Sequence, residues 1–149
     1  MRDGPFDQGC RPLESVFPWE AMMRFMMIVK ATKESEAGLP PDPRLMEAIG
    51  KLAAEGFASG EMIASGGLAP TAMGTRIRIG GGRLSVTDGP FAETKELIGG
   101  FAIFELPSKE AAIENGRRFM ALHTEVLGPA YEGELEIRQM FGPEDFATP

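Results

Sequence analysis

Two segments of this chain are apolar at nearly every position, which restricts the sheet that they can form. Residues 24–30 read RFMMIVK, and residues 101–106 read FAIFEL. A strand with one solvated face alternates apolar and polar residues, whereas a continuous apolar run is typical of a strand buried on both faces. We therefore expect a sheet that needs cover on each side.

Two amphipathic helices are predicted to supply that cover on one face. Asp42 is a good N-cap in front of a proline, and the apolar residues that follow recur at helical spacing until Gly60. Ser108 caps a second helix, whose inward stripe starts at Ala112 and reaches His123.

The remaining strands complete a recognisable order. Alternation at 75–79 and 83–87, around the three glycines between them, predicts a β-hairpin. An apolar stretch at 61–68 and an alternation of charged and apolar residues at 134–141 predict two further strands. The order β-α-β-hairpin-β-α-β predicts an α+β, ferredoxin-like split βαβ fold with an antiparallel sheet and an inserted β-hairpin. Both helices of such a fold lie on one face, so we expect the other face to bury itself in a homodimer.

The chain is predicted to contain one domain. Residues 1–23 hold three prolines and no sustained period, which indicates an irregular N-terminal arm; residues 24–149 then form the domain with a short C-terminal tail.

A net charge of −7 argues against nucleic acid and against anionic membrane surfaces as partners. The N-terminus does not resemble a signal peptide, no apolar run is long enough for a membrane span, and the single Cys10 cannot form an intrachain disulfide. We expect a cytoplasmic protein.

Motifs for metals and cofactors are missing from the sequence. There is one histidine and one cysteine, and no metal-ligand spacing, nucleophile elbow or phosphate-binding loop. We therefore expect no metal and no cofactor.

The most distinctive stretch is 87–96, TDGPFAETKE, between two predicted strands. Asp88, Glu93, Lys95 and Glu96 could lie at the lip of a pocket, where desolvation and charge pairing shift pKa values toward acid/base work. An aspartate before Gly-Pro can equally fix a turn by accepting backbone N–H bonds, and Lys95 and Glu96 can equally be solvated.

His123 is the second candidate for proton transfer, because an imidazole titrates near neutral pH. A histidine in the last turns of a helix can also simply favour the helix C-terminus. Arg76 could hold an acidic ligand or belong to a solvated edge strand; Tyr131 is a weaker candidate. The predicted catalytic residues are Asp88 and His123, and the predicted ligand-binding residues are Arg76, Phe91, Glu93, Lys95 and Glu96.

The segment DGPFAETKE at 88–96, followed by Gly99, Gly100 and Phe101, resembles the signature of the DGPF-type branch of the YCII-related proteins. The strand at 24–30 and the ELEIR at 134–138 resemble the same family, so the resemblance covers about residues 24–142. It implies a dimeric α/β-barrel built from ferredoxin-like subunits, with a cleft beside the sheet.

The resemblance also bears on activity. Better-studied relatives are associated with a His–Asp pair whose histidine opens the first helix, but residues 42–46 read DPRLM here and contain no histidine. That pair cannot be carried over.

Two functions stay open. One is a small-molecule-binding, cofactor-independent acid/base enzyme of the isomerase or lyase type, with Asp88 as base or orienter, His123 as proton carrier, and Lys95 or Arg76 steadying an anionic group. The other is a non-catalytic ligand-sensing or regulatory module, linked to an alternative sigma factor as in some DGPF-type relatives.

Overall fold

The structure is a computed structural model that describes residues 22–92 and 96–146. Its main sheet has the strand order β2-β5-β1-β6, and each neighbouring pair is antiparallel. The strands are β1 (Met23–Lys30), β2 (Met62–Gly67), β5 (Ile98–Leu106) and β6 (Leu135–Met140). This is the strand order of the ferredoxin-like fold, so the predicted α+β class is confirmed. The predicted arm lies outside the described residues as far as position 21.

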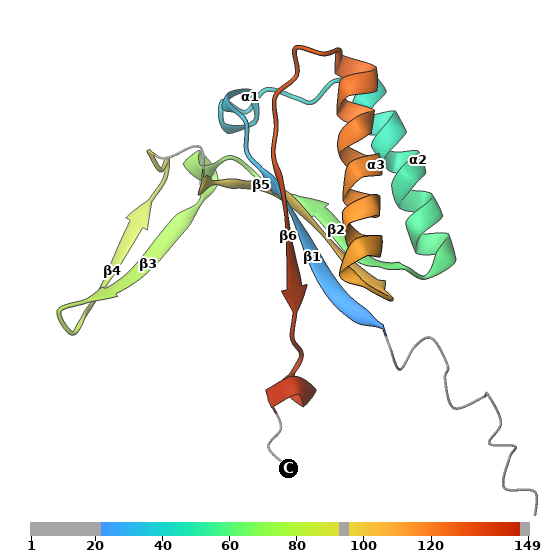
Figure 1. The fold of residues 1–149 in the computed structure, drawn as a ribbon. Coiled ribbons are helices and arrows are strands. Elements are labelled where there is room, and N and C mark those ends of the chain that lie inside the picture. The colour runs from blue at the N-terminus through green and yellow to red at the C-terminus, as the bar shows by residue number, and fades with distance from the viewer. Residues whose placement is uncertain (1–21, 93–95, 147–149) are drawn as a thin grey trace, which may run out of the picture.

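Helices α2 (Pro43–Ser59) and α3 (Lys109–Leu127) cover one face of the sheet (Figure 1). Their predicted N-caps are present, since the Asp42 side chain accepts from the Arg44 amide and the Ser108 side chain accepts from the Ala111 amide. Three short helices are too brief to leave a periodic signal in the sequence: α1 (Lys33–Glu36), η3 (Thr71–Met73) and η5 (Pro143–Phe146). Of the helices described, none is long and apolar enough to cross a membrane.

The core lies between the two helices and the sheet. Its buried members are Phe25 and Met27 of β1, Phe104 and Leu106 of β5, and Ala112 of α3. The antiparallel register places Phe25 opposite Phe104, so the two central strands contribute neighbouring phenylalanines to the core. Helix α3 packs closely on β6 at Gly116, because a Cβ added there would lie 3.0 Å from the Leu135 side chain.

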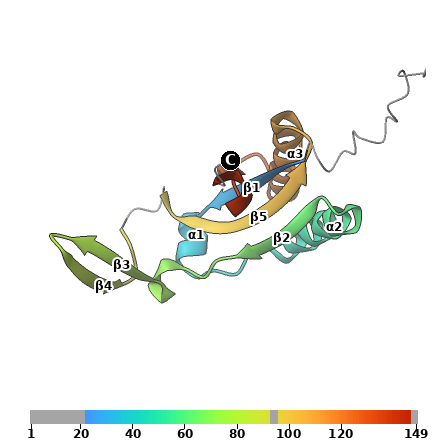
Figure 2. The same cartoon turned by 90° about the horizontal axis from the view of Figure 1, so that it is seen from below.

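The opposite face of the central strands carries a second set of apolar side chains. Strand alternation places Met26 and Ile28 of β1 beside Ile103 and Phe101 of β5 on this face. All four side chains are partly exposed, and no element of the described residues packs over them (Figures 1 and 2). We call these four residues the open sheet face.

The predicted hairpin consists of β3 (Thr75–Gly80) and β4 (Arg83–Asp88) and forms a separate two-stranded sheet. It projects from the main sheet on the side opposite α2 and α3 (Figure 1). Its turn uses Gly81 and Gly82 at φ +58° and +75°, the left-handed backbone that two-residue hairpin turns require.

One predicted strand boundary is wrong. The sequence places two glycines ahead of the strand at 101–106, whereas β5 begins at Ile98 and contains both of them. The reason is close backbone contact: a Cβ at Gly100 would lie 3.1 Å from the Gly66 carbonyl oxygen, and one at Gly99 would lie 3.2 Å from the Ala31 Cα. The glycines here permit strand pairing instead of interrupting it.

Candidate functional site

A cavity of about 1760 Å³ lies between the helix pair and the core side of the sheet. It exists because α2 makes its main contacts with α3 and β2, and not with the central strand β1. Most of the lining side chains are apolar and come from both helices and both central strands. They include Met27, Val29, Leu45, Ile49, Leu52, Phe104, Phe119 and Leu127.

Polar groups also line this cavity, several of them on α1, on α3 and on the segment after α3. Among them are Glu34 of α1, Asn115 and His123 of α3, and Tyr131. Asn115, Phe119 and His123 follow one another at intervals of four residues, so they share one face of α3.

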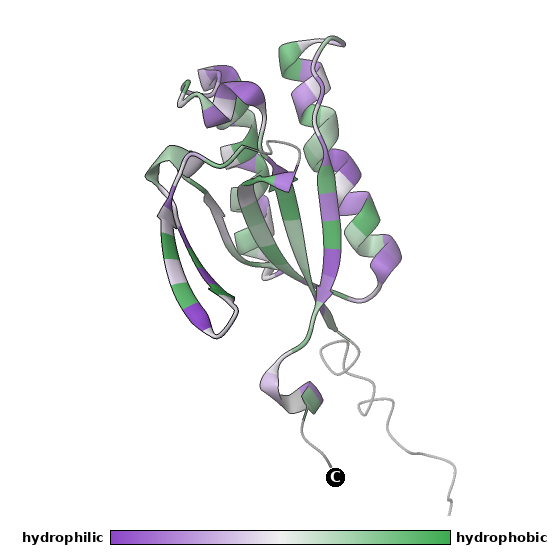
Figure 3. Ribbon diagram, turned by 90° about the vertical axis from the view of Figure 1, so that its left-hand side faces the viewer, coloured by the Kyte–Doolittle hydropathy of each residue, from purple (hydrophilic) through white to green (hydrophobic). Residues whose placement is uncertain are grey.

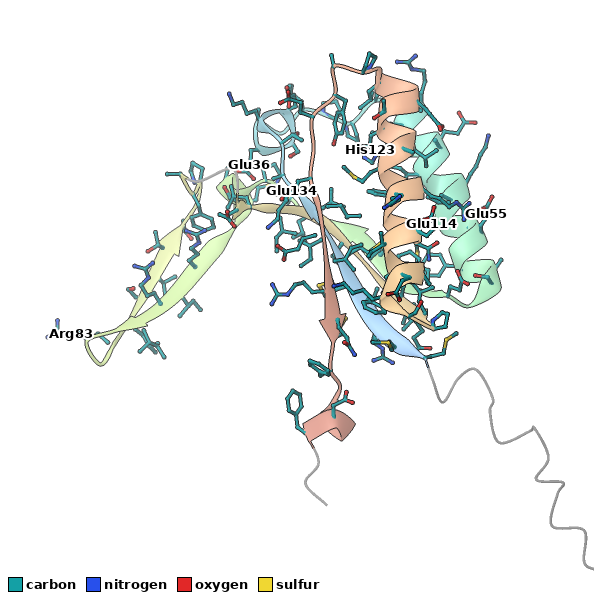
Figure 4. The ribbon with its side chains drawn as sticks, viewed as in Figure 1. Glu36, Glu55, Arg83, Glu114, His123 and Glu134 are labelled. Atoms are coloured by element: carbon teal, nitrogen blue, oxygen red, sulfur yellow. The ribbon has the colours of Figure 1, made fainter. Side chains whose placement is uncertain are left out.

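His123 is the one buried polar residue within 22–92 and 96–146, with 5% of its surface exposed. Its Nδ1 lies 3.0 Å from the carbonyl oxygen of Phe119. A carbonyl can only accept, so the neutral imidazole carries its hydrogen on Nδ1 and keeps a lone pair on Nε2. Nε2 has no hydrogen-bond partner among the described residues, and the ring lines the cavity. In Figure 4 His123 lies on α3, and Arg83 marks the hairpin tip at the other side of the molecule.

Two aromatic rings hold this imidazole. The Phe119 ring meets it edge-on with centroids 4.8 Å apart, and the Tyr131 ring stacks on it at 5.1 Å. Burial raises the pKa of the Tyr131 hydroxyl, and the negative charge of Glu34 raises it further. Gly133 lies close against the Tyr131 ring, because a Cβ at Gly133 would lie 2.5 Å from the Tyr131 Oη.

Asp88 does not line this cavity with His123. It is exposed at the end of β4, and its Oδ1 accepts a hydrogen bond from Thr75 Oγ1 at 3.0 Å. Strand β4 lies on the opposite side of the sheet from α3 (Figure 1). The two predicted catalytic residues are therefore not brought together, and the hydrogen bond of Asp88 joins the first and last residues of the hairpin.

The residues after Asp88 attach the hairpin to the rest of the molecule through Thr71. A Cβ at Gly89 would overlap the Thr71 carbonyl oxygen, so only glycine allows this approach. The Phe91 amide donates to Thr71 Oγ1 at 3.1 Å, and that hydroxyl donates to Glu36 Oε2 at 2.6 Å. The Thr71 amide donates to the second Glu36 oxygen at 3.0 Å. The DGPF segment thus links the hairpin to η3 and α1.

The predicted ligand-binding residues divide into three groups. Arg76 lies over the Phe91 ring, with Cζ 3.7 Å from the ring centroid, so these two residues contact each other in a cation–π pair outside the cavity. Glu96 lines the cavity and lies 4.0 Å from Lys30 Nζ. Glu93 and Lys95 lie outside the described residues.

Asn115 and Glu34 are among the polar residues of the cavity that sequence reasoning missed. Asn115 could have been found from its spacing to His123 on one helix face, whereas Glu34 belongs to a helix with no periodic signal. Within residues 22–92 and 96–146, no three His, Cys, Asp or Glu side chains are grouped so that they could hold a metal ion.

Comparison with known proteins agrees with this architecture. The family model of the YCII-related domain matches residues 23–122, from the start of β1 to the last two turns of α3. No curated protein is significantly similar to the chain in sequence. The match covers about two-thirds of the chain and includes both central strands, the hairpin, and most of the helix that carries His123. The chain belongs to the YCII-related domain family.

Proposed function

We propose that this protein binds a small, largely apolar organic molecule between its helix pair and its sheet, and that His123 exchanges a proton with it. One observation carries the proposal: a buried imidazole has its Nδ1 engaged by a backbone carbonyl and keeps Nε2 for the cavity. A fixed tautomer at the wall of an apolar cavity is suited to general base chemistry.

The charges around the cavity favour an uncharged ligand over an anion. Among the described residues, seven carboxylates line it against three cationic side chains, Lys30, Lys33 and Arg118, and two of these three have carboxylate partners. Arg118 Nη2 lies 3.3 Å from Glu55, and Lys30 Nζ lies 3.8 Å from Glu136. An anionic ligand would have to compete with these carboxylates, whereas apolar surface gains free energy by leaving water. The proposal therefore differs from one in which Lys95 or Arg76 steadies an anionic group.

The chemistry available to His123 is proton transfer without a cofactor. Nε2 would accept a proton from the ligand, and the electron pair of the broken bond would stay on the ligand. Return of the proton at another atom gives an isomerisation, and departure of a leaving group with its electron pair gives an elimination. The alternative function, a ligand-sensing or regulatory module, shares the binding step and lacks the proton transfer.

The binding step can be tested with the uncharged fluorophore N-phenyl-1-naphthylamine. We expect saturable fluorescence with the untagged protein, and protection of its single histidine from carbethoxylation by diethylpyrocarbonate. The Ala53→Phe variant places an aromatic ring in the cavity and should weaken both effects. Ala54→Phe is the matched control, since Ala54 is exposed on the same helix and does not line the cavity. Equal binding by both variants would contradict the proposed site.

The proton-transfer step needs its own experiment. Wild-type protein is expected to catalyse solvent-deuterium incorporation into uncharged ketones that displace the fluorophore, as measured by proton NMR. His123→Phe keeps the aromatic stack and should bind the same ketones without exchanging their protons. Binding with no exchange by the wild type would instead favour the sensing module.

We further propose that the protein is a homodimer joined through the open sheet face. Four partly exposed apolar side chains on the two central strands support this, because a patch of this kind is typical of an interaction site. Light scattering should return a dimer mass at micromolar concentration, and a monomer mass would refute the dimer. A cytoplasmic location stays a prediction from the sequence.

A further inference from the structure

One face of the hairpin β3–β4 carries four large apolar side chains that are exposed. Ile77 pairs with Val86 and Ile79 pairs with Leu84 across the two strands, so the four side chains form one patch. Their exposed fractions are 70%, 68%, 76% and 71% in that order. We call these four residues the apolar hairpin face.

A hairpin that stands free in water has no use for four exposed apolar side chains on one face. Two strands alone are marginally stable in water, and three or more strands or a packed surface are normally needed. The main body of the chain holds the base of the hairpin through Thr71, which accepts a hydrogen bond from the Phe91 amide, but none of its described elements covers the apolar hairpin face. Side chains that alternate this regularly and remain exposed indicate a surface that packs against another molecule.

The charge of the hairpin indicates what kind of molecule packs against its apolar face. Arg76, Arg78 and Arg83 against Asp88 give the hairpin a net charge of +2, so the other residues of the chain carry −9. A basic arm on an acidic protein is complementary to the body of another copy of the same chain.

The position of the hairpin leads to the same partner. It projects on the side of the sheet that the helices leave open, so it stands beside the open sheet face (Figures 1 and 3). A second copy seated on the open sheet face would come within reach of the apolar hairpin face. In a two-fold dimer each copy would offer one arm and receive one, so both unpartnered apolar surfaces would be buried together.

We propose that the β3–β4 hairpin is a dimerisation arm whose apolar face packs against a second copy of this chain. The proposal rests on the dimer through the open sheet face and adds a second contact region to it. The cavity that contains His123 is on the other side of the sheet, so the arm is independent of the proposed ligand.

Sedimentation equilibrium of three variants separates the arm from the sheet contact. Ile79→Thr/Leu84→Thr makes the apolar hairpin face polar while keeping β-propensity, and Arg78→Lys/Ser85→Thr changes the other face as the control. Ile103→Thr tests the open sheet face. We expect the apolar-face variant to raise the dimer Kd at least tenfold, the control to stay within twofold, and Ile103→Thr to weaken the dimer as well. Circular dichroism checks that each variant is folded.

The outcomes are distinct. If the apolar-face variant dimerises with the wild-type Kd while Ile103→Thr does not, the arm is overturned and the sheet contact stands. If the apolar-face variant weakens the dimer and Ile103→Thr does not, the arm stands and the sheet contact fails. Even weak specific interfaces associate at about 100 µM. If the wild type is a monomer at that concentration, both the arm contact and the sheet contact are overturned.

A paramagnetic label gives a second readout that does not depend on affinity. The Cys10→Ser/Ser85→Cys variant carries a nitroxide on the hairpin and is mixed with unlabelled ¹⁵N chain. We expect broadening of ¹⁵N amides near Ile28 and Phe101, which can arise only between two copies. Broadening that is absent from a sample shown to be dimeric would overturn the arm.

Discussion

The rings of His123 and Tyr131 stack with their centroids 5.1 Å apart and an angle of 29° between their planes. This contact joins the C-terminal part of α3 to the segment that leads into β6. Because His123 also lines the cavity, the position of Tyr131 determines how the imidazole is presented. Gly133 in turn confines Tyr131, since a Cβ there would lie 2.5 Å from the tyrosine oxygen.

Gly133→Ala is therefore predicted to displace the Tyr131 ring from His123. We expect a loss of about 1–3 kcal/mol in the free energy of unfolding, the usual cost of forcing a methyl group into a packed site. Chemical denaturation measures the stability, and carbethoxylation of His123 should become faster as the stacked ring moves away.

Gly50→Ala is the matched control for this glycine substitution. Gly50 lies within α2 with no atom within 4 Å of an added Cβ, so alanine meets no clash there. Alanine also favours the helix by about 0.5–1 kcal/mol relative to glycine. The control should be slightly more stable than the wild type; equal losses in both variants would contradict the role given to Gly133.

Stability at high pH should depend on Tyr131. Its pKa is raised in the folded protein above the ordinary value of 10.0, by burial and by Glu34. Below pH 10 the tyrosine is protonated in both states and contributes no pH dependence. Above pH 10 the unfolded state loses its proton first, so stability falls as the pH rises toward the folded pKa. Urea denaturation from pH 8 to about 11 should show a steeper decline for wild type than for Tyr131→Phe; parallel curves would contradict it.

The Thr71 hydroxyl links three segments, because it donates to Glu36 and accepts from the Phe91 amide. Thr71→Val keeps the shape and removes both bonds, leaving the carboxylate and the amide without this partner. We predict a loss of about 1–3 kcal/mol in the free energy of unfolding. Thr71→Ser retains the hydroxyl and should cost clearly less, so similar losses in the two variants would argue against the hydrogen-bond explanation.

Gly89→Ala tests how the hairpin is held at its base. A Cβ there would overlap the Thr71 carbonyl, so the backbone must move and the contacts of Phe91 with Thr71 should be lost. We expect amide hydrogen exchange across 75–88 to accelerate while exchange in β1 and β5 stays slow. Gly80→Ala, at a position with open space, is the control. Unchanged exchange in Gly89→Ala would contradict the proposed attachment.

Much of the fold could be read from local sequence. The caps at Asp42 and Ser108, the paired glycines of the hairpin turn and the period of each strand act over a few residues, so they are visible without knowing what packs against what. The start of β5 is not predictable in this way, because the same residue type that breaks a strand also allows two backbones to approach closely.

The site depended on tertiary structure. Local patterns are sufficient to predict that Asp88 ends a strand in a distinctive motif and that His123 lies on the inner stripe of a helix. Only the packing of the sheet decided that they lie on opposite sides of it, with Asp88 bonded to Thr75 and His123 in an apolar cavity. The physical reason is that spacing along the chain sets which face of an element a residue occupies, whereas the distance between two elements is set by what fills the space between them. Here α2 stands away from β1, and the cavity beside His123 is the result.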